Sequence, residues 1–156
     1  MALASSRSGL KSPISKSFAR SLIHKAYFEG SEMSTIIYNT PYCQLKHLKA
    51  QNAILCQWKQ FCRGDDYREP LKFATQEIEK YQITTWITDT TNGFESEEAD
   101  TKWLLNEFVP SMISSSIEKV VFIIANDSPL IHEIKAQEVA LSLFFEVELV
   151  ESLNAV

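Results

Sequence analysis

Two carboxylates and a pair of threonines are the side chains of this sequence that are best placed for chemistry. Asp89 directly follows the β-prone run 84–88 (TTWIT), and Thr90 and Thr91 come next. Asp100 follows in the next polar stretch. Ligands of α/β sheets commonly bind at the carboxyl ends of strands. If Asp89 and Asp100 came together, they could act as general acid and general base, provided that their pKa values differed.

Each of these residues also has a structural interpretation, and the sequence leaves both open. Asp89 can accept backbone N–H bonds and organise its loop. Thr90 and Thr91 are candidates for phosphorylation, which would add up to about two negative charges, but they also suit an ordinary turn. Asp100 and Trp103 lie one helical turn apart and share a face. We expect Trp103 to anchor a core more than to hold a ligand, and we keep Asp89, Asp100 and Trp103 as binding candidates.

No other catalytic set is recognisable in the sequence. His47 alternates with apolar residues and is expected to pack in a strand, whereas His132 is expected on a solvated helix face. There is no HExxH motif, and four glycines in the whole chain leave no Gly-rich phosphate loop. Cys43, Cys56 and Cys62 form no CxxC pair, which favours reduced thiols and no zinc site. We therefore expect a non-enzymatic protein with no catalytic residue, cofactor or metal.

Composition and charge limit the classes of partner. The chain has 156 residues, of which 45% are hydrophobic and 22% charged, as in one ordinary globular domain. Residues 1–28 carry five basic side chains and no acid, while the remainder is strongly acidic. An acidic body repels phosphate backbones, so we expect no nucleic-acid partner. No apolar run approaches the roughly 20 residues that span a bilayer, so we expect no integral membrane association. Reduced cysteines favour a cytoplasmic location.

The first 33 residues have a different composition from the rest. They lack the unbroken apolar segment of a secretory signal, but their basic, Ser-rich character is typical of organellar transit peptides. A third interpretation is that translation begins at Met33. We expect a disordered or dispensable leader over residues 1–33 and a single domain over residues 34–153.

Hydrophobic periodicity predicts the elements of that domain. Apolar runs or alternation indicate strands at 35–38, 42–49, 53–60, 84–88, 119–125 and 143–150. A helix is expected over 67–81, with Asp65 or Asp66 as its N-cap and Pro70 in its first turn. A second helix should start at Ser96, and because Pro110 cannot continue a regular helix we expect a kink or a break near Val109. A third helix should start at 128–129. The order β-β-β-α-β-α-β-α-β predicts an α/β fold: a mixed, mostly parallel sheet of about five strands flanked by helices.

The order of several short motifs resembles a known family. The sequence runs from Gln57-Trp58-Lys59 through Ile87-Thr88-Asp89 and Asp100-x-x-Trp103 to Phe108-Val-Pro110, and then to the strand 120–125. Over about residues 34–149 this pattern is similar to small bacterial STAS-like proteins, which are related to anti-sigma-factor antagonists and to the CRAL-TRIO lipid-transfer fold. The resemblance implies a sheet of four to five strands flanked by helices. It implies fold more than activity, because most members are uncharacterised.

Three functional hypotheses follow. The first is a regulatory or protein-binding module of STAS-like type, with an unknown protein partner and homodimerisation through a sheet edge or helix face. The second is a carrier of a small apolar or lipid-like ligand, which the aromatic residues Phe73, Trp86, Phe94, Trp103 and Phe108 would surround and which requires a real cavity. The third is an enzyme that uses the carboxylate pair.

Overall fold

The computed structural model describes residues 34–93 and 96–152. The predicted leader with Met33, the aromatic candidate Phe94 and the last residue of the predicted domain lie outside the described residues. Within the described residues, no helix combines the length and the apolar character needed to cross a membrane.

One mixed sheet organises the chain. Its strands are β1 (Ser34–Asn39), β2 (Cys43–Leu48), β3 (Ala53–Trp58), β4 (Thr85–Asp89), β5 (Lys119–Ile123) and β6 (Glu146–Val150). They lie side by side in sequence order, with the first two pairs antiparallel and the last three parallel. The prediction of an α/β fold with a mixed sheet is confirmed, and the sheet has six strands where about five were expected.

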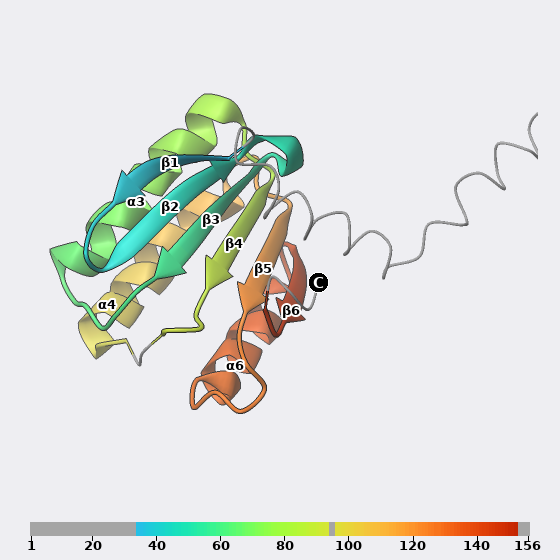
Figure 1. The fold of residues 1–156 in the computed structure, drawn as a ribbon. Coiled ribbons are helices and arrows are strands. Elements are labelled where there is room, and N and C mark those ends of the chain that lie inside the picture. The colour runs from blue at the N-terminus through green and yellow to red at the C-terminus, as the bar shows by residue number, and fades with distance from the viewer. Residues whose placement is uncertain (1–33, 94–95, 153–156) are drawn as a thin grey trace, which may run out of the picture.

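Helices connect the parallel strands and cover one side of the sheet. They are α3 (Asp65–Tyr81), α4 (Glu98–Trp103), the π-helical turn η3 (Leu104–Phe108), α5 (Val109–Ile113) and α6 (Ile131–Leu141), and a short 3-10 turn, η2 (Lys49–Gln51), joins β2 to β3. Each parallel strand is added on the same side of the previous one, and right-handed crossovers then place every connecting helix on the same face. Figure 1 shows α3, α4 and α6 behind the sheet.

Three details of the predicted helices are wrong. Pro70 lies inside α3, because that helix begins at Asp65 behind Gly64, which takes the N-cap position with φ of 61°. Glu97 precedes α4 as its N-cap, instead of Ser96. The third helix, α6, begins at Ile131 and not at 128–129. The kink or break predicted near Val109 corresponds to the π-helical turn η3, which widens the helix where Pro110 cannot donate a hydrogen bond.

The two faces of the sheet carry different cores. On the helix face, which we define as the side of α3 to α6, buried residues of every central strand pack against the helices, among them Leu45, Ile54, Trp86, Val120 and Phe122. The alternate residues lie on the second face. Its buried cluster consists of Leu48, Ala53, Leu55, Ile87, Ile123 and Val150.

The last strand is shorter than predicted. Residues 143–145 belong to the turn between α6 and β6, and β6 begins only at Glu146. As a result Leu143 and Phe144 are 80% and 58% exposed instead of contributing to the sheet.

Candidate functional site

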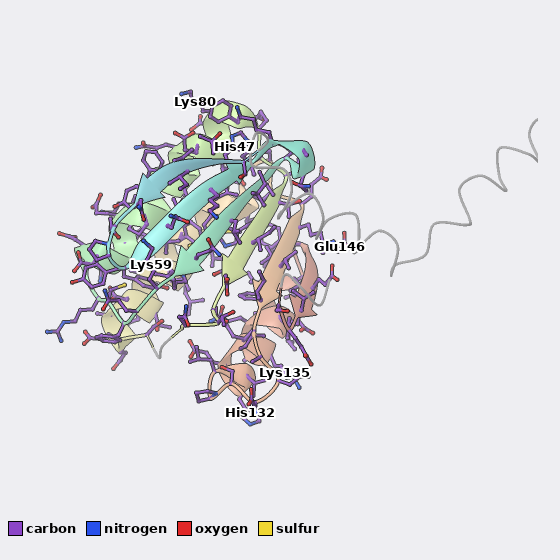
Figure 2. The ribbon with its side chains drawn as sticks, viewed as in Figure 1. His47, Lys59, Lys80, His132, Lys135 and Glu146 are labelled. Atoms are coloured by element: carbon purple, nitrogen blue, oxygen red, sulfur yellow. The ribbon has the colours of Figure 1, made fainter. Side chains whose placement is uncertain are left out.

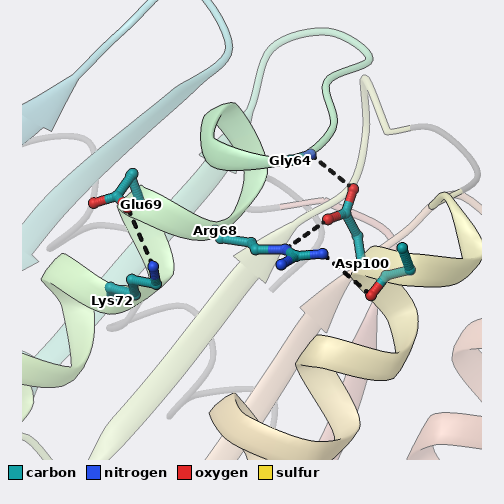
Figure 3. Close-up of polar contacts among 6 residues, drawn as sticks. Gly64, Arg68, Glu69, Lys72 and Asp100 are labelled. Atoms are coloured by element: carbon teal, nitrogen blue, oxygen red, sulfur yellow. Dashed lines mark hydrogen bonds and ion pairs between the residues drawn. The ribbon is translucent and has the colours of Figure 1, made fainter.

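Asp100 is a buried connector between two helices. Its side chain is only 3% exposed, and it accepts hydrogen bonds from the Gly64 N–H at 3.0 Å and from Arg68 Nε at 2.9 Å (Figure 3). The guanidinium of Arg68 also lies 5.8 Å from the centre of the Trp103 ring. These contacts join the start of α3 to α4, and they occupy both oxygens of Asp100.

Asp89 has a separate set of partners. Its Oδ1 accepts bonds from the Thr91 N–H at 2.9 Å and from the Thr91 hydroxyl at 2.6 Å, and Gln57 Nε2 approaches its Oδ2 at 3.4 Å. In register it lies level with Gln57 and Ile123, which places it on the second face. Asp100, in contrast, belongs to a helix on the helix face. The structure therefore does not bring the two carboxylates together, and a shared acid–base site has no geometric support.

The two threonines after Asp89 have different surroundings. Thr90 is half-buried and its hydroxyl donates to the carbonyl oxygen of Ile123 at 2.7 Å. Thr91 is exposed and bonded to Asp89. Phosphorylation of Thr91 would replace this bond by repulsion between the phosphate and the carboxylate.

Trp103 packs as part of the helix layer. It is half-buried, and its ring centre lies 6.4 Å from that of Phe108 in a stacked arrangement. Phe108 in turn meets Trp86 of β4 edge to face at 5.4 Å. Trp103 thus stacks on Phe108, and it is Phe108 that contacts the sheet through Trp86.

A pocket that the sequence analysis did not locate lies between the sheet and the helices. Its volume is about 110 Å³. Its floor is formed by helix-face residues of β4 and β5, and its sides come from η3, α5 and α6; they include Trp86, Val120, Phe122, Phe108, Met112 and Ile134. Thr90, Gly93 and Ser96 line it where the loop leaves the carboxyl end of β4. This is the region of an α/β sheet in which ligands commonly bind.

Thr88 is a buried polar residue in the lining of this pocket. It is 8% exposed, lies in register with Cys56 and Phe122 on the helix face, and lines the pocket. Its side-chain hydroxyl has no hydrogen-bond partner among residues 34–93 and 96–152. Buried polar groups are nearly always paired, so the hydroxyl of Thr88 can donate a hydrogen bond to, or accept one from, a water or ligand in the pocket.

The ionisable groups around the pocket favour an uncharged ligand. Burial raises the pKa of the Tyr67 phenol, which keeps this lining residue protonated. Of the charged residue types, the described lining contains only Glu133, on α6, and no lysine, arginine or histidine. An anionic ligand would therefore find no cation among the described lining residues.

Among residues 34–93 and 96–152, no histidine or cysteine lines the pocket. His47 is 8% exposed, packs against the ring of Tyr81 at 5.0 Å, and has its pKa lowered by burial. Figure 2 shows His132 at the outer side of α6. The Sγ atoms of Cys43 and Cys56 are 3.7 Å apart, and both residues are buried. Burial raises the pKa of the Cys56 thiol, which makes it unreactive.

We predict opposite stability effects for two Thr→Val changes at this site. Thr88→Val removes an unpaired buried hydroxyl and should raise the free energy of unfolding of the ligand-free protein by about 1 kcal/mol. Thr90→Val removes the bond to the Ile123 carbonyl and should lower it by about 1 kcal/mol. Urea unfolding followed by circular dichroism measures both. Destabilisation by Thr88→Val would contradict the absence of a protein partner for its hydroxyl.

Comparisons of the chain with protein-family models, with characterised proteins and with solved structures give no match in any of the three.

Proposed function

We propose that this protein binds a small, largely apolar and uncharged molecule in the pocket between β4, β5 and the helices. The observation that carries the proposal is the buried hydroxyl of Thr88, which faces the pocket and has no hydrogen-bond partner in the part of the chain that the structure describes. A ligand with one hydrogen-bonding group and an apolar body would satisfy this hydroxyl and cover the aromatic floor.

The size of the pocket narrows the class of ligand. A volume of about 110 Å³ is somewhat smaller than the roughly 150 Å³ of a cavity that admits benzene. A complete lipid is therefore too large for the pocket as it stands. A short alcohol, amide or single-ring compound with its polar atom directed at Thr88 fits best.

The test is a native mass spectrum of the protein purified from its own host, compared with a denaturing spectrum. We expect an adduct of low mass that is lost on denaturation. Gln137 lines the pocket from α6, and Gln137→Trp should fill the space and lower the occupancy at least 10-fold. The matched control is Gln76→Trp, at an exposed position of α3, which should leave the occupancy unchanged.

Two results would count against the proposal. One is an adduct that persists in Gln137→Trp at the wild-type level, because the ligand would then lie elsewhere. The other is a bare mass from the host combined with no binding of small alcohols or single-ring amides by wild-type protein in titration.

A regulatory, protein-binding role of STAS-like type is the second candidate. An exposed apolar patch supports it: Val139, Leu143 and Phe144 at the end of α6 are 73%, 80% and 58% exposed. Contiguous exposed apolar surface often marks an interaction site, and these three residues are close in sequence. In the same native spectra, a dimer that disappears in Leu143→Asp would favour this candidate over the carrier.

A further inference from the structure

Part of the second face of the sheet is buried although no described helix lies on it. Leu55 and Ile87 are 2% and 1% exposed, and Ile123 is 1% exposed. The helices α3, α4 and α6 all lie on the other side (Figure 1). Side chains stand roughly perpendicular to a sheet, so neighbours within the sheet leave their tips uncovered. Burial this deep requires atoms above the second face.

The buried residues of this face form a diagonal band. In register, Leu48 and Ala53 lie level with Ser34, the first residue of β1. Leu55 and Ile87 lie two residues further along their strands, and Ile123 and Val150 two further again. The band thus starts beside Ser34 and ends at the far edge of the sheet.

Only one stretch outside the described residues is long enough to cover this band. From β2 to β6 the sheet measures roughly 19 Å, at about 4.8 Å per strand. Residues 153–156 reach at most about 14 Å when fully extended, and residues 94–95 follow the opposite end of β4. Residues 1–33 join the sheet at Ser34, where the band begins.

The composition of residues 1–33 also suits this surface. They contain five basic and two acidic side chains, against ten basic and eighteen acidic ones in the rest of the chain. Leu10, Ile14, Phe18 and Leu22 recur every four residues, a spacing that favours a single apolar helical stripe. A helix of eighteen residues, with a rise of about 1.5 Å per residue, would be roughly 27 Å long, which is enough to follow the band.

We infer that residues 1–33 bind to the second face of the sheet and cover the band formed by Leu48, Ala53, Leu55, Ile87, Ile123 and Val150. Under this inference the segment completes a second core, and it differs from the dispensable leader expected from composition alone. The stripe containing Phe18 supplies the apolar contact, and the opposite charges of the segment and the body favour the association.

The test places a thiol probe on the second face of the full chain. Leu55→Cys is treated with N-ethylmaleimide, and labelling is followed by peptide mass. We expect labelling at least 100-fold slower than at Glu98→Cys, an exposed position. Adding Phe18→Asp should accelerate labelling of Cys at position 55 at least 10-fold. The neighbouring change Ser17→Asp, outside the stripe, should alter the rate less than twofold, and Phe18→Leu should preserve protection.

Three outcomes would overturn the inference. The first is rapid labelling in the full chain. The second is protection that Phe18→Asp and Leu22→Asp both leave unchanged. The third is protection that appears only at high protein concentration, which would assign the face to a second copy of the chain. Circular dichroism of each variant verifies folding, and Ile87→Cys serves as a second probe in the same design.

Discussion

Replacing Asp100 by alanine is expected to lower the free energy of unfolding by about 2–4 kcal/mol. The change leaves the guanidinium of Arg68 and the N–H of Gly64 without their shared acceptor. This loss is toward the lower end of the losses measured for broken buried ion pairs, because the Arg68 side chain is 30% exposed and can recover some hydration. Urea unfolding monitored by tryptophan fluorescence measures the difference.

Two variants separate the contributions at this position. Asp100→Asn keeps an oxygen that can accept from Gly64 but loses the charge opposite Arg68, so we expect roughly half of the alanine effect. Glu98→Ala removes an ion pair with Lys102 whose side chains are 83% and 69% exposed, and it should change stability by less than about 0.5 kcal/mol. An Asp100→Ala protein as stable as Glu98→Ala would refute the connector role.

Replacing Phe108 by alanine should cost about 3–5 kcal/mol and enlarge the pocket. Phe108 is 4% exposed, lines the pocket and contacts the rings of Trp86 and Trp103. The lost ring leaves space that joins the existing pocket. Saturating indole, a single small apolar ligand, should therefore recover part of the lost stability, because binding to the native state alone shifts the unfolding equilibrium.

Phe144→Ala is the matched control for this prediction. The Phe144 ring is 58% exposed at the turn before β6, so its removal should change stability by less than about 0.5 kcal/mol, and indole should have no effect beyond that on wild-type protein. If indole stabilised Phe144→Ala as much as Phe108→Ala, its binding site would lie outside the pocket.

The elements followed from local patterns because each pattern reflects which side chains are buried. Alternation at 42–49 and 53–60 predicted the hairpin of β2 and β3, and steps of three and four predicted α3. Pro110 marked the site of the π-helical turn through its missing donor. Ends of elements were less accurate, as at Gly64 and Glu97, because a cap depends on the loop geometry that precedes the helix.

The candidate site depended on contacts that local patterns do not contain. Asp100 was selected by its helical spacing from Trp103, but its partners Gly64 and Arg68 are 36 and 32 residues away in sequence. Thr88 has an ordinary place in a β-prone run. Only the packing of η3, α5 and α6 over β4 places its hydroxyl at a pocket, with no partner among the described residues. The alternation of β4 does predict that Thr88 shares a face with Trp86, and this was the signal in the sequence that placed Thr88 on the helix face.

By itself the sequence determined the order of strands and helices, the mixed sheet and the acidic body, because periodicity and composition are properties of neighbouring residues. Only the tertiary structure decided that Asp89 and Asp100 lie in separate networks, that a pocket opens beside Thr88, and that a band of the second face of the sheet is buried. These features arise where segments that are distant in the sequence pack together. The free energy that stabilises such packing is spread over many residues, so no local pattern reveals it.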